Sequence, residues 1–417
     1  MSRCSFRLFI SLCSFFLVVG VQLYAAEKKN SLHPDKTICL NMIVKDETHV
    51  IRRCLESVKP FITYWVIVDT GSTDGTQDMI KDFMEGIPGE LHERPWVNFQ
   101  VNREEALRLA KGKADYIFFI DADDWIKLDQ DFIWPSLTKD YYTVKTVAGG
   151  WEYDNVRLIK YGLDWHWRDV LHEYVHAENA VTSGALTGMY NIFTHQGARS
   201  KDPKKYIKDA QVLEQALKDE PDNKRYVFYL AQSYYSAGDM PKALEIYENR
   251  VSLGGWDQEV FWSLLQVAKI QEELGYDPKV VEASYGRAFR YRTSRVEPLY
   301  YLVTNWRKKE NYQRGYDISR VAINMTMSND NLFVEKWIYD YGLLFEYSIC
   351  AYWTGHYEES LKACDALLAN PKLPTSFRDF TLKNRAYAWE KVRQQSIQKA
   401  ISELLPEEEV NTSAKHE

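Results

Sequence analysis

The sequence predicts an α/β domain with a mostly parallel sheet, followed by an all-α domain of helical repeats. At 417 residues the chain is long enough for two or three domains of ~150 residues each. Apolar strand-like runs alternate with helix-like segments up to about residue 200, and after that only the helical period remains. We assign residues 27–200 to the α/β domain, 201–400 to the repeats and 401–417 to a tail expected to be disordered.

The chain begins with an apolar segment. Residues 8–26 carry no charge and follow Arg3 and Arg7. A run of this length suits both a long signal peptide and a short membrane anchor. Lysines at positions 28 and 29 follow the run, so the charge bias does not decide its orientation. We therefore assign residues 1–26 to a signal peptide or membrane anchor.

Two strands and the helix between them open the α/β domain. Residues 38–44 (ICLNMIV) and 64–68 (YWVIV) are almost wholly apolar, which is typical of strands buried on both faces. Near residues 47–58 the apolar positions recur at the helical period, which predicts a helix. The second strand ends at Asp69, and a turn rich in glycine and hydroxyl side chains follows it.

The pattern of strand and helix then repeats. A helix is predicted at about 76–84, another helical segment at 102–110, and a short apolar strand at 116–120 that ends at Asp121. Such alternation indicates a parallel sheet covered by helices. Because ligands bind these sheets beyond the carboxyl ends of the strands, Asp69 and the acidic residues 121–124 lie where a ligand is expected.

Helical repeats are indicated after residue 201. Residues 224–255 fit a helix-turn-helix repeat of the 34-residue tetratricopeptide kind, with Ala231 and Gly238 at positions that require small residues. Weaker copies follow around Gly315 and around Gly355. A single helix pair cannot bury its apolar face alone, so neighbouring pairs must stack.

Composition excludes one class of partner and one class of scaffold. The net charge is −7 and no basic stripe is long enough to follow a phosphate backbone, so we expect no nucleic-acid binding. Beyond the apolar segment the cysteines have neither disulfide-framework nor metal-ligand spacing. We expect them to be buried free thiols: Cys39, Cys54, Cys350 and Cys364.

The acidic segment Asp121-Ala122-Asp123-Asp124 directly follows an apolar strand. A hard divalent cation held by carboxylate oxygens would neutralise the charge that develops on a leaving diphosphate. Carboxylates at i and i+2 either reach one metal together or divide between the metal and a ribose. The alternative is a solvated acidic loop or a helix cap.

The second polar cluster is the turn that starts at Asp69 (DTGSTDGT). A carboxylate at a strand tip accepts a hydrogen bond from a pyrimidine N–H, and a glycine-rich turn lets the backbone approach a nucleotide. The alternative is a plain strand-turn-helix in which Asp74 caps the next helix.

Four motifs in series resemble those of the family-two glycosyltransferases of GT-A fold: residues 38–47 (ICLNMIVKDE), 53–58 (RCLESV), 68–76 and 120–124. Within that family the chain is most similar to the bacterial branch with tetratricopeptide repeats after the catalytic domain. The resemblance covers residues 38 to about 370. It implies an inverting transfer of a sugar from a nucleotide-diphosphate sugar to an acceptor hydroxyl, with a divalent cation, Mn or Mg.

The resemblance implies which residues bind the donor. Asp69 matches the position that contacts the nucleobase, and Asn41 and Val44 are expected to line the tip of the first strand nearby. Arg103 matches an arginine that faces the diphosphate, since a guanidinium binds phosphate oxygens in pairs. The polar neighbour of this arginine precedes it here, as Asn102, whereas the family has it afterwards.

The resemblance also implies a metal site. Asp121 and Asp123 match the family's acid pair, with Asp123 as the more direct metal ligand and Asp121 shared with the donor. His195 matches a histidine that completes the metal coordination or touches the diphosphate, and imidazole is a reasonable manganese ligand. We expect Asp124 to turn towards solvent or the sugar.

An inverting transfer needs a carboxylate opposite the leaving group, to take the proton of the acceptor hydroxyl. Residues 170–173 (VLHE) resemble the family segment that carries this base, so Glu173 is the first candidate and Asp169 the second. The alternative for Glu173 is a structural bond to an arginine or to backbone. The spacing of three nearby histidines does not indicate a metal site: His166, His172 and His176.

Two other function classes remain open. One is a catalytically inactive nucleotide-sugar fold whose repeats bind a protein partner, and the complete set of expected site residues argues against it. The other is a nucleotidyltransferase of the same architecture, which would have a glycine-rich, basic first loop that residues 41–47 lack.

The acceptor is not identified by the sequence: a glycan, a lipid and a protein all remain candidates. We expect the repeats to offer a surface to a protein partner. Sugar nucleotides are made in the cytosol, so we expect a membrane-associated enzyme with its catalytic domain on the cytosolic side. Secretion, or a lumenal location after signal cleavage, is the alternative.

Overall fold

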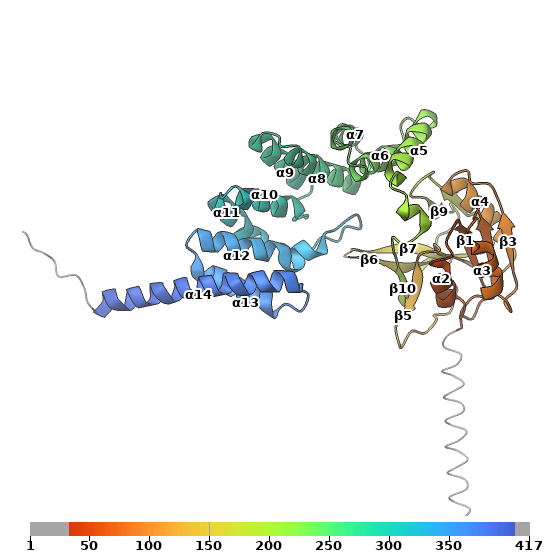
Figure 1. The fold of residues 1–417 in the computed structure, drawn as a ribbon, viewed down its shortest axis with the longest axis horizontal. Coiled ribbons are helices and arrows are strands. Elements are labelled where there is room, and N and C mark those ends of the chain that lie inside the picture. Colours follow the sequence, from red (N-terminus) through yellow and green to blue (C-terminus); the bar gives the residue numbers. More distant parts are fainter. Residues whose placement is uncertain (1–32, 150, 405–417) are drawn as a thin grey trace, which may run out of the picture. The chain divides into compact units, whose positions relative to one another are not determined.

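The computed structural model describes residues 33–149 and 151–404, and it divides at Gly238–Asp239 into two compact units (Figure 1). The predicted signal or anchor at 1–26 lies outside the described residues, as does the tail from residue 405. Within the described ranges, no helix combines the length and the apolar character that crossing a bilayer requires.

An eight-stranded sheet forms the centre of the first unit, in the order β3-β2-β1-β4-β7-β6-β10-β5. Its strands are β1 (Ile38–Val44), β2 (Tyr64–Asp69), β3 (Gly89–Glu93), β4 (Tyr116–Phe119), β5 (Trp125–Leu128), β6 (Tyr141–Ala148), β7 (Trp151–Lys160) and β10 (Ser183–Ile192). Strands β3, β2, β1 and β4 are mutually parallel, and β6 pairs parallel with β10. The remaining pairs are antiparallel. The prediction of a mostly parallel α/β sheet is confirmed.

Helices cover both faces of the parallel half, which explains why its inner strands β1, β2 and β4 are almost wholly apolar. α2 (Ile51–Val58) and α3 (Thr76–Phe83) pack on one face, in a core shared with Leu40 of β1. α4 (Phe99–Ala110) packs on the other, in a core shared with the adjacent Cys39. Successive side chains of a strand point to opposite faces, so both cores draw on the same short apolar runs.

Several predicted boundaries shift by a few residues. The helix expected from residue 47 begins at Ile51, because residues 47–50 form a turn bonded to the start of α3: Glu47 N–H donates to Thr76 Oγ1 (2.8 Å). The helix expected from residue 102 begins at Phe99, after Asn98 caps it. The strand predicted at 116–120, which is β4, ends one residue early, at Phe119.

Smaller elements complete the first unit. β8 (His166–Arg168) and β9 (Tyr174–His176) form a two-stranded sheet. The chain then continues through η1 (Ala198–Lys201), α5 (Lys205–Asp219) and α6 (Lys224–Ser236). Helical structure thus starts close to the predicted boundary at 200/201, whereas the division into compact units falls after α6. The domain boundary at 200/201 stays a prediction.

The second unit is all helix, as predicted for helical repeats. It contains α7 (Met240–Leu253), α8 (Asp257–Glu273), α9 (Pro278–Tyr291), α10 (Glu297–Lys308), α11 (Tyr312–Ala322), the π-helical turn η2 (Ile338–Gly342), α12 (Leu343–Trp353), α13 (Tyr357–Ala369) and α14 (Thr375–Leu404). Gly315 allows α11 to approach α12 closely, since a Cβ there would lie 2.7 Å from Cys350 Sγ. All four described cysteines are buried and free, which confirms the prediction.

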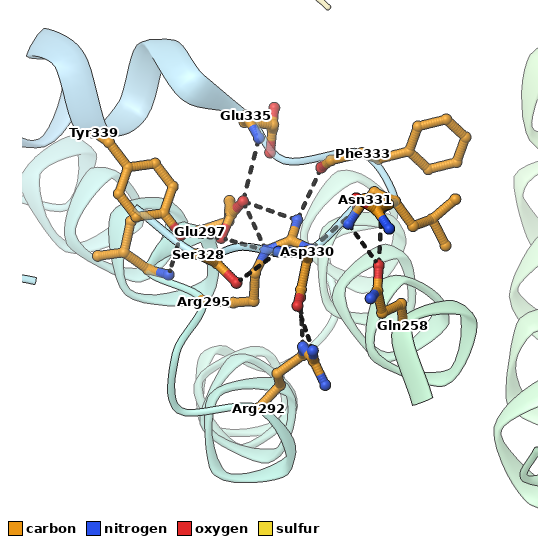
Figure 2. Close-up of polar contacts among 12 residues, drawn as sticks. Gln258, Arg292, Arg295, Glu297, Ser328, Asp330, Asn331, Phe333, Glu335 and Tyr339 are labelled. Atoms are coloured by element: carbon orange, nitrogen blue, oxygen red, sulfur yellow. Dashed lines mark hydrogen bonds and ion pairs between the residues drawn. The ribbon is translucent and has the colours of Figure 1, made fainter. Parts of the chain in front are cut away.

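A buried arginine holds the long connection between α11 and η2 (Figure 2). Arg295 is fully buried, and its Nε donates to both carboxylate oxygens of the equally buried Glu297 (2.9 and 3.0 Å). Its Nη1 donates to Asp330 (3.2 Å) and its Nη2 to the carbonyl of Phe333 (2.8 Å). A buried guanidinium requires such partners, because an unpaired charge in a protein interior is costly.

Candidate active site

The carboxyl ends of β1, β2 and β4 meet at one edge of the sheet. Val44, the last residue of β1, pairs with Asp69, the last residue of β2. Asp121 follows β4, which pairs with β1 on its other side. The two polar clusters that the sequence singles out therefore follow the two strands that flank β1, where a ligand of a parallel sheet is expected.

Asp69 is fully buried, and in the described residues only one of its two carboxylate oxygens has hydrogen-bond partners. Its Oδ1 accepts hydrogen bonds from the N–H groups of Gly71 and Ser72 (2.9 Å each) and from Gln77 Nε2 (3.0 Å). Its Oδ2 has no hydrogen-bond partner in the described part of the chain. Burial raises the pKa of this carboxyl, but the bonds from Ser72, Gln77 and Gly71 outweigh it and hold the pKa below its usual value. The group is thus an ionised acceptor with a free oxygen.

Arg103 of α4 joins two of the predicted site residues. Its Nη2 donates to Asp121 Oδ1 (2.5 Å) and its Nε to Glu173 Oε1 (2.6 Å). Its guanidinium carbon lies 5.0 Å from the centroid of the Trp167 ring. Burial raises the pKa of Asp121, but the charges of Arg103 and Arg157 outweigh it and lower the pKa. Two donor groups of Arg103, Nη2 and Nε, thus bind Asp121 and Glu173. The contact of Arg103 with a diphosphate stays a prediction.

Asp124 is enclosed, and this corrects the expectation that it turns towards solvent or the sugar. It is fully buried and accepts hydrogen bonds from Asn191 Nδ2 (2.8 Å), Thr194 N–H (3.2 Å) and Arg157 Nη2 (3.5 Å). Burial, and next the charge of Asp121, raise its pKa to about 7. Asp124 therefore ties the acidic segment to β7 and β10.

Asp123 faces the loop that carries His195. Its Oδ2 accepts from Gly197 N–H (3.0 Å). The pKa of the Asp123 carboxyl lies above its usual value, because burial and the charge of Asp121 raise it more than the bond from Gly197 and the nearby imidazole of His195 lower it. His195 itself is exposed and packs edge-on against Phe193.

The donor atoms near Asp123 suit a divalent cation that arrives with a substrate. No group of three or more His, Cys, Asp or Glu side chains in residues 33–149 and 151–404 is arranged to hold a metal ion. The predicted set of Asp121, Asp123 and His195 therefore does not form a protein cage, and Asp121 is bonded to Arg103 instead. Mg²⁺ in proteins usually keeps several coordinating waters and binds one or two carboxylates together with phosphates of the substrate. Asp123, with His195 beside it, fits that requirement.

The two predicted bases have different partners. Glu173 is bonded to Arg103, whereas Asp169 Oδ2 accepts from Arg225 Nε of α6 (2.8 Å). Burial raises the pKa of Asp169 against the effect of Arg225. Of the two, only Glu173 shares its partner with Asp121, the acidic residue that follows β4.

The nearby histidines have separate surroundings. His166 and His176 are cross-strand partners in β8 and β9. His172 stacks on Tyr229 with ring centroids 3.8 Å apart, and burial lowers its pKa to about 3.

Asn41 and Val44 occupy different parts of β1. Asn41 lies in the middle of the strand, which corrects its expected place at the tip, and only Val44 ends the strand. The buried Asn41 amide donates to the carbonyls of Val66 (3.3 Å) and Ala106 (2.9 Å), so it links β1 to β2 and α4. A donor contact by Asn41 stays a prediction and would require these bonds to be given up.

Two arginines at the site were not predicted. Arg157 of β7 approaches Asp121 (4.0 Å) and Asp124, and Arg53 of α2 donates to the backbone carbonyl of Asp123 (2.7 Å). The available signal for Arg53 was its place at the start of the motif at residues 53–58.

Comparison with known proteins finds similarity over parts of the chain. Residues 39–132 match the model of "Glycosyl transferase family 2". Over 109 residues the chain is 35% identical to the SPbeta prophage-derived glycosyltransferase SunS of Bacillus subtilis, covering 26% of this chain and 24% of that protein. Over 147 residues it is 30% identical to a TPR repeat-containing protein of Synechococcus elongatus, covering 33% and 35%. The matches thus span only about a quarter to a third of these relatives.

Solved structures resemble the chain only distantly. TarS of S. aureus aligns with a TM-score of 0.31 and 11% identity, covering 62% of this chain and 53% of TarS. A tetratricopeptide repeat protein of Parabacteroides merdae aligns with a TM-score of 0.33 and 17% identity, covering 48% and 72%.

Proposed function

We propose that this chain, in which residues 39–132 form a family 2 glycosyltransferase domain and tetratricopeptide-like helices follow, moves a sugar from a nucleotide-diphosphate donor to an acceptor hydroxyl with inversion. The observation that carries the proposal is the bridge made by Arg103. Its side chain binds both Glu173, the candidate base, and Asp121, the acidic residue that follows β4.

The reaction can be assigned to named groups. Glu173 takes the proton of the acceptor hydroxyl while the hydroxyl oxygen forms a bond to the anomeric carbon. The bond from that carbon to the phosphate oxygen breaks, and its electron pair leaves with the nucleoside diphosphate. Arg103 holds Glu173 in a fixed orientation, with its face packed near Trp167. Both candidate bases bind an arginine, but Asp169 suits the role less well, because its partner is Arg225 on α6 and not Arg103, which also binds Asp121.

The donor nucleotide is recognised at Asp69 in this proposal. The free Oδ2 of an ionised carboxylate accepts hydrogen bonds only, so it favours a base that presents a ring N–H, as uracil and guanine do. When bound, Mn²⁺ or Mg²⁺ supplies positive charge to the diphosphate, and Asp123, with His195 nearby, would hold it.

A panel of nucleotide sugars tests the proposal, with release of nucleoside diphosphate as the readout and Mn²⁺ or Mg²⁺ added. We expect turnover that EDTA abolishes and that Asp123→Ala lowers by orders of magnitude. Glu173→Gln is expected to lower turnover by roughly 10²–10⁴-fold. Full activity in excess EDTA would contradict the metal requirement. Release of pyrophosphate would identify a nucleotidyltransferase, and inactivity with every donor would favour a binding protein.

The acceptor, the partner and the location extend the proposal. In this proposal the helices of the second unit bind a protein partner or a chain that carries the acceptor. The catalytic domain lies on the cytosolic side of a membrane. A C-terminal reporter that is active only in the cytosol tests the location, because a silent reporter on a well-expressed, membrane-bound fusion would refute it.

A further inference from the structure

The loop of residues 194–198, called the closing loop below, is fastened to the start of α2. Ala198 N–H donates to Glu47 Oε1 (3.1 Å), and His49 Nε2 lies 2.7 Å from the carbonyl of Gln196. Arg53 Nη1 donates to the side-chain oxygen of Gln196 (2.9 Å). Three side chains from residues 47–53 thus hold a loop that lies more than 140 positions later in the chain.

The same guanidinium also holds the acidic segment. Arg53 Nη2 donates to the backbone carbonyl of Asp123 at 2.7 Å, and Thr194 Oγ1 donates to that carbonyl at 2.8 Å. A guanidinium has its donors in a rigid fork, so binding two groups fixes the distance between them. Arg53 therefore fixes the acidic segment and the closing loop relative to each other.

Packing at Gly197 shows how closely these parts approach. A Cβ at this residue would lie 3.0 Å from Asp123 Oδ2 and 3.1 Å from Glu47 Oε1, so two carboxylates meet at one backbone position. Two consecutive N–H groups, of Gly197 and Ala198, each bind one of these carboxylates. A small displacement of the closing loop would therefore disturb both bonds together.

We infer that Arg53 is a positioning residue, which holds the Asp123 carbonyl and Gln196 so that the Asp123 carboxylate and the His195-bearing loop present one surface to a diphosphate and its cation. This inference rests on the proposed function, although the role of Arg53 in ordering the closing loop can be tested without any ligand. The chain offers a matched control in Arg52, an exposed neighbour on the same helix whose ion pair with Glu56 stays within α2.

The first measurement is amide hydrogen exchange of residues 197 and 198 in the ligand-free full chain. We expect Arg53→Met to speed exchange about tenfold or more, because two hydrogen bonds from a charged donor are lost. Arg52→Met should exchange like the wild type, and Arg53→Lys, with one ammonium for two acceptors, should fall between them. Thermal midpoints of all variants establish that the change is local. Exchange in Arg53→Met within twofold of that in Arg52→Met would overturn the inference.

The second measurement is the Kd for Mn²⁺ in the presence of UDP, with a parallel series in GDP, by isothermal titration calorimetry. We expect Arg53→Met to raise this Kd about tenfold and Arg52→Met to leave it unchanged; an equal Kd in both variants would overturn the inference. If the wild type binds Mn²⁺ with neither nucleotide, the proposed function fails, and the exchange experiment still decides whether Arg53 orders the loop. If Arg53→Met does not fold, Arg53→Lys takes its place, and wild-type exchange and Kd there would overturn the inference.

Discussion

Replacing Arg103 with methionine leaves Glu173 inside the protein without its cationic partner. The two side chains are each 11% exposed, whereas Asp121, the other partner, is 38% exposed and can be solvated. Removing one member of a buried ion pair costs roughly 3–5 kcal/mol, and the accessible Asp121 favours the lower end, about 3 kcal/mol. At about 3 °C per kcal/mol for a unit of this size, the midpoint of the first unit should fall by about 9 °C.

A chemically similar pair that also involves α4 provides the control. Arg94 donates to Glu105 of α4 at 2.6 Å, but these side chains are 34% and 28% exposed. An exposed pair of this kind contributes about 0–1 kcal/mol, so Arg94→Met should lower the midpoint by no more than about 3 °C. The two variants remove the same group and differ mainly in the burial of what they leave behind.

A double-mutant cycle separates the orphaned charge from lost packing. Glu173→Gln in the Arg103→Met background removes that charge, so the double variant should be more stable than the sum of the single losses by about 1–2 kcal/mol. Scanning calorimetry at neutral pH gives the three energies. Additive losses, or equal losses for Arg103→Met and Arg94→Met, would refute the reasoning.

Three other variants test separate parts of the structure. Asp69→Asn should weaken UDP or GDP binding by about 10–100-fold in calorimetric titrations, because a neutral amide replaces a charged acceptor, and an unchanged Kd would contradict the nucleobase role. Gly197→Ala places a Cβ 3.0 Å from Asp123 Oδ2 and should weaken Mn²⁺ binding in the presence of the nucleotide; an unaltered Kd would show that the closing loop adjusts freely. Arg295→Met leaves the buried Glu297 without its cationic partner and should destabilise the second unit by about 3–5 kcal/mol in urea unfolding, whereas a loss below 1 kcal/mol would mean that the connection in Figure 2 contributes little.

The strands were predictable because their signal is local. β1 has the bounds that the sequence predicts, and β2 differs only by including Asp69, since unbroken apolar runs mark strands that are covered on both faces. The start of α2 was not predictable in the same way. Thr48 continues the helical period in the sequence, but its N–H and hydroxyl bind Asp74 in another loop, and that contact holds residues 47–50 in a turn.

The partners of the acidic segment depend on contacts between distant residues. Asp124 looks like a surface acid next to Asp123, yet its partners Arg157, Asn191 and Thr194 lie 33 to 70 positions later and become neighbours only when β7 and β10 join the sheet. For the same reason the sequence located Arg103 at the site but did not show that it bridges two carboxylates. Local pattern identifies which residues reach the edge of the sheet, and tertiary pairing decides what each one binds.

The charges at this edge explain why a cation is expected there. Arg103 compensates Asp121, while Asp124, with a pKa of about 7, is only partly ionised at neutral pH and faces Arg157. Asp123 receives a backbone N–H but no cationic side chain among the bonds of the described residues. A diphosphate that approaches Asp123 therefore meets like charge unless a divalent ion lies between them. On this reasoning Asp123→Asn should reduce the gain in UDP affinity that Mn²⁺ provides, and should raise UDP affinity when the metal is absent, because the like charge is removed.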